Sequence, residues 1–157
     1  MESFSYYDLG RIEYGEALDL QTNSFQSLID AKRKGLEEKN CLYFCEHNPV
    51  LTLGKSGKET NLLVPELLLK EKGVSLFHID RGGDITYHGP GQITGYPVFD
   101  LDGFGMGLKA YIHTLEDIVI EFLLLYGVKA ERLDGATGVW LDSKVPGAAR
   151  KICAIGV

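Results

Sequence analysis

Apolar residues recur along the chain at two different spacings, and these spacings predict a mixture of helices and strands. Two long segments, 14–34 and 108–126, repeat apolar side chains mostly every three or four residues, as one face of an amphipathic helix requires. A shorter helix is predicted at 66–72, since a proline precedes it and a glycine follows it. The stripe expected to be buried on the second long helix consists of Leu108, Ile112, Leu115, Val119, Phe122, Leu123 and Tyr126.

Shorter apolar runs, bounded by glycine, proline and polar residues, predict strands. The predicted strands are 40–46, 50–53, 75–80, 93–101, 128–133, 138–141 and 151–157. The first of them is apolar on both faces, which indicates a central position in a sheet. Helices and strands are mixed without regular alternation, so an α+β fold is expected rather than a doubly wound parallel one. The length of 157 residues fits a single domain.

The end of the chain is unusually apolar. The predicted strand 151–157 runs to the last residue, whereas domains usually end in a polar surface tail. We therefore expect this chain to be part of a longer protein. An edge strand that ends the domain is the alternative.

Composition narrows the possible functions. The formal net charge is −6, which disfavours general nucleic-acid binding because phosphate neutralisation needs clustered cations. No apolar run approaches the roughly 20 residues that cross a membrane. The three cysteines, an odd number without a secretory segment, indicate reduced thiols and a cytoplasmic protein. Cys41 and Cys45 match no zinc-ligand spacing, so no metal site is expected.

The segment 81–92 carries the most chemical information. It places four glycines, one proline, one arginine and one histidine within twelve residues. Glycines let backbone N–H groups approach a ligand, and an arginine can hold a carboxylate or phosphate through two hydrogen bonds. Thr86 and His88 alternate in phase on an extended segment, so both could face one pocket. A binding loop is favoured over the alternative, a glycine-rich hairpin with a hydrogen-bonded histidine.

The same segment closely resembles the signature of the lipoyl(octanoyl) transferase family. The matching run is Arg81-Gly-Gly-Asp-Ile-Thr-Tyr-His-Gly-Pro-Gly-Gln92, followed by Tyr96-Pro97. Three further blocks resemble the family in the same order: 46–54 with 61–63, 135–140 and 151–156. The resemblance therefore covers nearly the whole chain. It implies the fold of lipoate and biotin protein ligases, a mixed sheet flanked by helices.

The resemblance also implies a reaction. Members of the family take an octanoyl group from acyl carrier protein, hold it as a thioester on a cysteine, and pass it to a lysine of a lipoyl domain, as in 2-oxoacid dehydrogenases or the glycine cleavage H protein. No cofactor is implied. By position, Lys151 matches the lysine that lowers the pKa of the nucleophilic thiol. The substrate site would be lined by Arg81, Gly82, Gly83, Asp84, Ile85, Thr86, Tyr87, His88, Ala154, Ile155 and Gly156.

This chain departs from the family at the nucleophile. The family cysteine lies beyond the block that ends at Val157, so we expect the 157-residue chain to be inactive in covalent transfer. Cys153 is two residues from Lys151, and on a regular strand the two side chains would share one face. We nevertheless interpret Cys153 as a core residue, because free cysteines are usually buried and inert.

Two other functions remain open from the sequence. One is an ATP-dependent lipoate or biotin protein ligase, which also places a glycine-rich segment and a lysine around an acyl chain. The other is an acyl-binding module without turnover. Of the four histidines, only His88 is interpreted as functional, whereas His47 before Asn48-Pro49 is expected to shape a turn.

Overall fold

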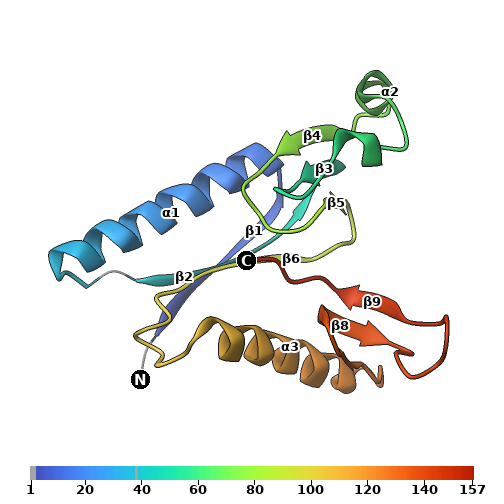
Figure 1. Ribbon diagram of the computed structural model, residues 1–157. Helices are drawn as coiled ribbons and strands as arrows, with labels where there is room; N and C mark the ends of the chain where they lie inside the picture. Colours follow the sequence, from blue (N-terminus) through green and yellow to red (C-terminus); the bar gives the residue numbers. More distant parts are fainter. Residues whose placement is uncertain (1–2, 38) are drawn as a thin grey trace. The chain divides into compact units, whose positions relative to one another are not determined.

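The computed structural model describes residues 3–37 and 39–157, apart from the side chain of residue 59, and is shown in Figure 1. The chain forms two compact units, Met1–Asp100 and Leu101–Val157. The first unit contains two sheets with helices α1 and α2, and the second contains one sheet with helix α3. The prediction of one catalytic domain over residues 1–157 stays a prediction.

The first unit is built on a sheet in the order β1-β2-β6. Its strands are β1 (Phe4–Ile12), β2 (Asn40–His47) and β6 (Thr94–Val98). β1 pairs parallel to β2, and β6 pairs antiparallel to it. The helix α1 (Tyr14–Lys34) lies along one face of this sheet. It ends at Gly35, whose φ of 65° provides the left-handed stop that the sequence predicts.

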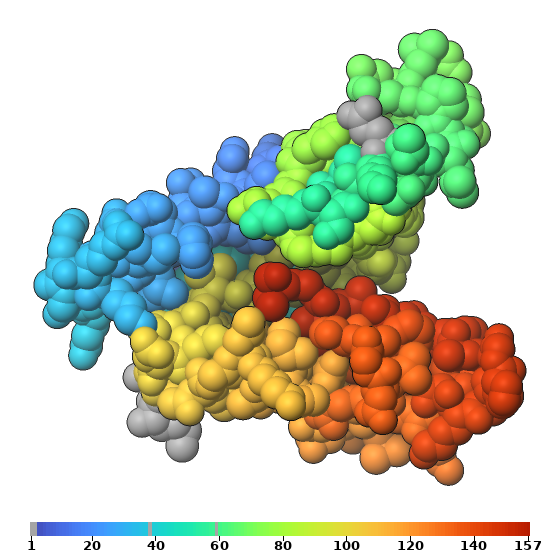
Figure 2. Space-filling model, in the orientation of Figure 1, coloured from blue at the N-terminus to red at the C-terminus, as the bar shows by residue number. Residues whose placement is uncertain are grey.

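A second mixed sheet in this unit has the order β4-β3-β5. Its strands are β3 (Val50–Leu53), β4 (Ser75–His78) and β5 (Ile85–His88). β3 lies in the centre, parallel to β4 and antiparallel to β5. The turn η1 (Glu59–Asn61) and the short helix α2 (Glu66–Glu71) connect β3 to β4. In the space-filling view of Figure 2, the segment around α2, in green, stands out from the rest of this unit.

The second unit packs a helix on an antiparallel sheet. Helix α3 (Leu108–Leu125) contacts β8 (Ala136–Leu141), which lies between β7 (Glu131–Leu133) and β9 (Arg150–Cys153). Gly138 in β8 has a φ of 113°, and a Cβ there would lie 2.4 Å from the Cys153 carbonyl oxygen. Glycine at this position therefore allows β8 and β9 to approach closely.

The predicted α+β fold is confirmed, and β2 occupies the central position expected of it. The sequence analysis makes no prediction for residues 4–12, which form strand β1 without a regular alternation of exposed and half-buried residues. The predicted strand 151–157 is too long, because β9 and its pairing with β8 end at Cys153. None of the described helices has both the length and the apolar character that crossing a membrane requires.

Candidate functional site

The glycine-rich segment forms a loop that is fastened to the loop after β3. The amides of Gly54, Lys55 and Ser56 donate hydrogen bonds to the carbonyls of Asp84, Arg81 and Gly83, over 2.9, 2.9 and 3.1 Å. A Cβ on Gly54 would lie 2.6 Å from the Gly83 carbonyl oxygen, so this contact requires glycine. The carbonyls of the predicted binding loop are thus used to fix its shape.

Arg81 lies half-buried between two strands of the second sheet. Its Nη2 donates to Thr86 Oγ1 at 2.8 Å and to Thr52 Oγ1 at 3.3 Å, and its Nη1 donates to the Gly82 carbonyl at 2.6 Å. Both hydrogens of Nη2 are therefore engaged within the protein. A two-bond grip on a carboxylate or phosphate uses an edge of the guanidinium that includes Nη2, so in this arrangement it would require a threonine contact to break.

His88 is half-buried at the end of β5. Its Nδ1 lies 2.7 Å from Oε1 of Gln92, and the amide nitrogen of Gln92 donates to the Tyr87 carbonyl at 3.4 Å. Burial lowers the pKa of His88, and the nearby His47 and Arg81 lower it further, while the hydrogen bond to Gln92 acts in the opposite direction. The imidazole is therefore neutral at neutral pH.

Two buried rings, those of Tyr14 and His47, pack against His88. The Tyr14 ring stacks on His88 at a centroid distance of 6.2 Å and meets His47 edge-on at 5.3 Å. His47 is fully buried; its Nδ1 donates to the Ile12 carbonyl at 3.0 Å and its Nε2 accepts from the Tyr96 hydroxyl at 2.7 Å. Burial raises the pKa of Tyr96, which keeps that hydroxyl a donor. The sequence predicts only a turn-shaping role for His47, whereas its ring contacts residues of α1 and of the strands β1, β5 and β6.

The other predicted residues of this segment take different positions. Asp84 accepts a hydrogen bond from Asn61 at 2.7 Å, Ile85 pairs with Leu53 in the ladder, and Tyr87 is 51% exposed. Gly83 has a φ of 92°, a conformation that favours glycine. Arg81, Thr86 and His88 are the members of the set that lie around the Thr52 and His47 side chains.

In the second unit, Lys151 and Cys153 lie on opposite faces of the sheet. The register pairs Lys151 with Trp140 and Cys153 with Val139, so one extra residue, Ile152, forms a bulge. Neighbouring residues of a strand point to opposite faces, and cross-strand partners share a face. The expectation that Lys151 and Cys153 share a face is therefore wrong. Lys151 Nζ instead lies 4.6 Å from the centroid of the Trp140 ring.

The Cys153 thiol is not activated. Burial and the nearby Glu116 carboxylate raise its pKa, and Lys151 only partly opposes them. The predicted substrate residues Ala154, Ile155 and Gly156 follow β9 outside any regular element, with Ile155 half-buried and the other two exposed. The predicted site residues thus fall into a group in each unit.

Glu116 is a buried charged residue that sequence analysis did not single out. Its carboxylate accepts hydrogen bonds from the Gly138 amide at 2.9 Å, from Arg132 Nε at 2.7 Å and from His113 Nδ1 at 3.2 Å. Burial alone raises the pKa of Glu116, but these hydrogen bonds outweigh it and hold the pKa below its ordinary value. The only sequence signal is an acidic residue within the apolar stretch of α3.

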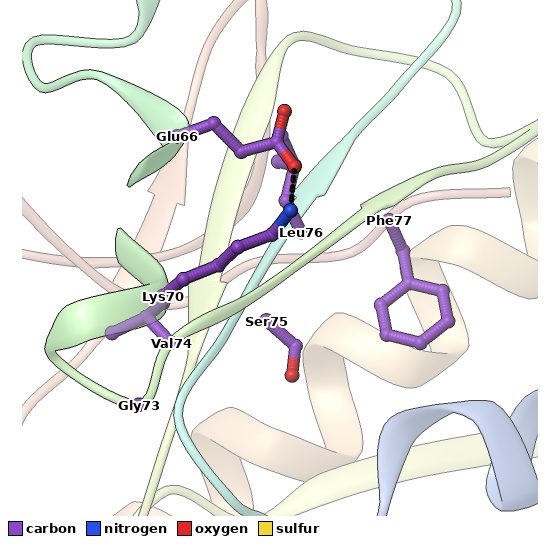
Figure 3. A pocket seen from close by; sticks show the side chains of 7 residues that line it. All are labelled: Glu66, Lys70, Gly73, Val74, Ser75, Leu76 and Phe77. Atoms are coloured by element: carbon purple, nitrogen blue, oxygen red, sulfur yellow. Dashed lines mark ion pairs between the residues drawn. The ribbon is translucent and has the colours of Figure 1, made fainter. Parts of the chain in front are cut away.

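An open groove of the first unit lies away from the glycine-rich loop. It has a volume of about 450 Å³ and runs between α2 and the edge strand β4, as Figure 3 shows. Glu66 and Lys70, paired at 3.1 Å, lie on its helix side, and Phe77 lies on the strand side. Phe77 also packs on Tyr14 at a centroid distance of 5.0 Å. Among the described side chains, which exclude that of residue 59, no group of three His, Cys, Asp or Glu could hold a metal ion.

The sequence of this chain matches a known family and is similar to several known proteins. The lipoyl protein ligase A/B catalytic domain matches residues 13–157. The octanoyltransferase of Parabacteroides distasonis is 68% identical over 157 residues, which are 100% of this chain and 71% of that protein. The octanoyltransferase of Porphyromonas gingivalis is 56% identical over 98% of this chain and 31% of that protein. A Bacteroides fragilis octanoyltransferase is 56% identical over 93% of this chain and 66% of that protein.

Solved structures of low sequence identity share the fold. A bipartite lipoate protein ligase from Thermoplasma acidophilum gives a TM-score of 0.63 at 17% identity, over 96% of this chain and 54% of that one. A lipoate-protein ligase A bound with ATP gives 0.55 at 17% identity, over 85% of this chain and 51% of that one. The resemblance seen in the sequence is thus confirmed, and the chain belongs to the lipoyl protein ligase A/B catalytic domain family.

Proposed function

We propose that this chain is part of an octanoyltransferase, which moves an octanoyl group from acyl carrier protein to a lysine of a lipoyl domain. The observation that carries the proposal is the 68% identity, over all 157 residues, to a protein named octanoyltransferase. The relatives compared are longer than this chain, which spans 71%, 31% and 66% of their lengths. We further propose that the protein acts in the cytoplasm and needs no cofactor.

The proposal assigns separate roles to the two groups of residues. In the first unit, residues Arg81–His88 line the acyl-substrate site, and the fastened loop presents His88 at its edge. In the second unit, Ala154–Gly156 provide backbone N–H groups for the acyl carbonyl oxygen, where negative charge develops. Lys151 acts there as a cation that favours a thiolate. Its contact with an aromatic ring is compatible with this role, because a cation–π contact preserves the charge.

The attacking thiolate is not Cys153 in this proposal. Its raised pKa keeps the thiol protonated at neutral pH, and its side chain lies on the face opposite to Lys151. Cys45 is a weaker candidate still, because burial raises its pKa to about 11. We therefore expect the 157-residue chain alone to form no octanoyl thioester.

The experiment compares this chain with a chimera in which its 157 residues replace the matching residues of the Parabacteroides distasonis relative. Each protein is incubated with octanoyl-acyl carrier protein, and its intact mass is measured before and after addition of a lipoyl domain. The chimera should gain one octanoyl group and transfer it, whereas the 157-residue chain should gain none. A chimera that folds but forms no adduct would contradict the proposal. An adduct on the short chain that disappears in Cys153→Ala would overturn the assignment of Cys153.

An ATP-dependent ligase is separated from the transferase by its products. A ligase releases pyrophosphate when it activates a free acid, whereas transfer from acyl carrier protein needs no nucleotide. Pyrophosphate release by the chimera with octanoate and ATP would favour the ligase. Binding of octanoate without either reaction would favour an acyl-binding module.

A further inference from the structure

We propose that Gln92 is a positioning residue that fixes His88 in one tautomer, so that an unprotonated Nε2 is offered to an N–H donor of the substrate. The identity of the substrate in this inference rests on the proposed function, whereas the tautomer of His88 does not depend on it. Its starting point is the pair of hydrogen bonds made by the Gln92 amide.

The first step is the orientation of that amide. Its nitrogen donates to the Tyr87 carbonyl at 3.4 Å, and a carbonyl oxygen can only accept. The amide oxygen therefore points to His88, where it lies 2.7 Å from Nδ1. The turn Gly89–Gln92 is closed by the backbone N–H of Gln92, which donates to the Gly89 carbonyl at 3.1 Å. This turn returns the chain so that the side-chain amide of Gln92 reaches His88.

The second step is the protonation state of the ring. The amide oxygen accepts only, so Nδ1 of His88 carries the hydrogen. The neutral imidazole then has a lone pair on Nε2. In the described part of the chain, residues 3–37 and 39–157 without the side chain of residue 59, no group makes a hydrogen bond with His88 Nε2. A half-buried acceptor without an internal partner is suited to receive a donor from outside the protein.

The groups that face His88 favour this neutral form. Tyr14 of α1 stacks on one side, and His47 of β2 lies at a centroid distance of 5.8 Å. Arg81, in the loop before β5, adds a positive charge, and Val50 of β3 is its apolar neighbour in the ladder. The carboxylate of Glu46 accepts from the Gly91 amide at 2.9 Å, so it is engaged with the backbone of the same turn.

Because Nε2 of His88 can only accept a hydrogen bond, it can contact only a part of the substrate that carries a donor. A thioester and a fatty chain offer no N–H, so an acceptor at Nε2 fits either the amine of the lysine or an amide of the arm that carries the acyl group. Both sources share an N–H donor. Their kinetic effects differ, because the first belongs to the acceptor protein and the second to the acyl donor.

The tautomer is tested on the 157-residue chain by long-range ¹H–¹⁵N NMR of its four histidines, with His88→Asn to assign the resonances. His88 should show a protonated Nδ1 and an unprotonated Nε2. Gln92→Glu places a carboxylate at the same Nδ1, and should raise the pKa of His88 by about one unit or more. Gln92→Met keeps the length without the acceptor and should yield a mixture of tautomers. Gln26→Glu, an exposed position on α1, is the matched control and should leave His88 unchanged.

Two results would overturn the assignment: a proton on Nε2 in the unmodified chain, or a His88 tautomer and pKa that are the same in all Gln92 variants. The substrate role is tested with Gln92→Met in the chimera. A several-fold higher KM for the lipoyl domain assigns the donor to the lysine, and a higher KM for the octanoyl donor alone assigns it to the carrier arm. Unchanged KM values would remove the substrate role. Absence of all transfer in the unmodified chimera would refute the proposed function and leave the NMR result standing.

Discussion

Thr52 lies directly opposite Thr86 in the antiparallel ladder of β3 and β5, and both hydroxyls accept from Nη2 of Arg81. Thr52 is fully buried, so its hydroxyl is shielded from water. The paired threonines hold the arginine at the base of the glycine-rich loop. This relationship explains how a loop with so many glycines keeps a defined shape.

Replacement of Thr52 by valine removes the hydroxyl and keeps the shape of the side chain. Arg81 then loses one of its two threonine acceptors in a partly buried site. We expect the free energy of unfolding to fall by about 1–3 kcal/mol, the cost of leaving a buried polar group without its partner. Urea denaturation measures the change. Thr52→Ser, which keeps the hydroxyl, should recover most of the loss, and equal destabilisation by serine and valine would show that packing alone is responsible.

Gly54→Ala tests the fastening of the loop. The added Cβ would lie 2.6 and 2.7 Å from the carbonyl oxygens of Gly83 and Arg81, and backbone atoms cannot move aside as a flexible side chain can. Overpacking of this kind typically costs about 1–3 kcal/mol. The amide resonances of residues 81–84 should also shift. Gly107→Ala is the matched control, since nothing lies within 4 Å of its Cβ, and similar losses in both variants would contradict the contact.

Much of the fold follows from the sequence because its signals are local. The helix α1 and its stop at Gly35 depend on apolar spacing and on the conformational freedom of one glycine, and both are confirmed. The stripe predicted for α3 is confirmed only in part, because Leu108, Phe122 and Tyr126 are exposed whereas Ile112, Leu115, Val119 and Leu123 are half-buried. The buried residues of this helix are Tyr111 and Glu116. Apolar periodicity cannot anticipate that a carboxylate is buried when an arginine from β7 and an amide from β8 satisfy it.

In the candidate site, too, local features follow from the sequence, whereas contacts between distant residues do not. The composition of 81–92 marks the segment, but the roles of Thr52 and His47 depend on strand register and on distant partners, Arg81 and Tyr96. Likewise, two-residue spacing predicts that Lys151 and Cys153 share a face, and a single bulge reverses the outcome. A bulge has no reliable signature in one sequence, because it depends on how the strand pairs with its partner.

Glu116 should make the stability of the protein depend on pH. Its pKa is lower in the folded chain than its ordinary value of 4.5, so its contribution is fully present above about pH 4.5 and is lost as the pH falls through the folded pKa. We expect unfolding free energy, measured in urea from pH 6 to pH 3, to decline in the unmodified chain. Glu116→Gln should be less stable by about 1–3 kcal/mol at pH 6 and should decline less steeply.

The matched control for that experiment is Glu121→Gln on the same helix, at an exposed position. It should leave both the stability at pH 6 and the decline toward pH 3 nearly unchanged. The pKa of Glu131 is also lowered, by hydrogen bonds from Ser143 and Lys144, and this half-buried carboxylate contributes to the decline in a salt-dependent way. Measurement in high salt therefore isolates the part that belongs to Glu116. An identical pH slope in Glu116→Gln and the unmodified chain would contradict its buried role.

Thiol alkylation separates a structural Cys153 from a nucleophile. The raised pKa values of Cys45 and Cys153 leave little thiolate at pH 8, so both should react with iodoacetamide much more slowly in the folded chain than in urea. Because Lys151 lies on the other face of the sheet, Lys151→Met should change the rate at Cys153 by less than about twofold. Mass spectrometry of digested protein follows each cysteine. Rapid alkylation of Cys153 that is lost in Lys151→Met would instead identify a working lysine–cysteine pair, and the nucleophile would then have to be sought within this chain.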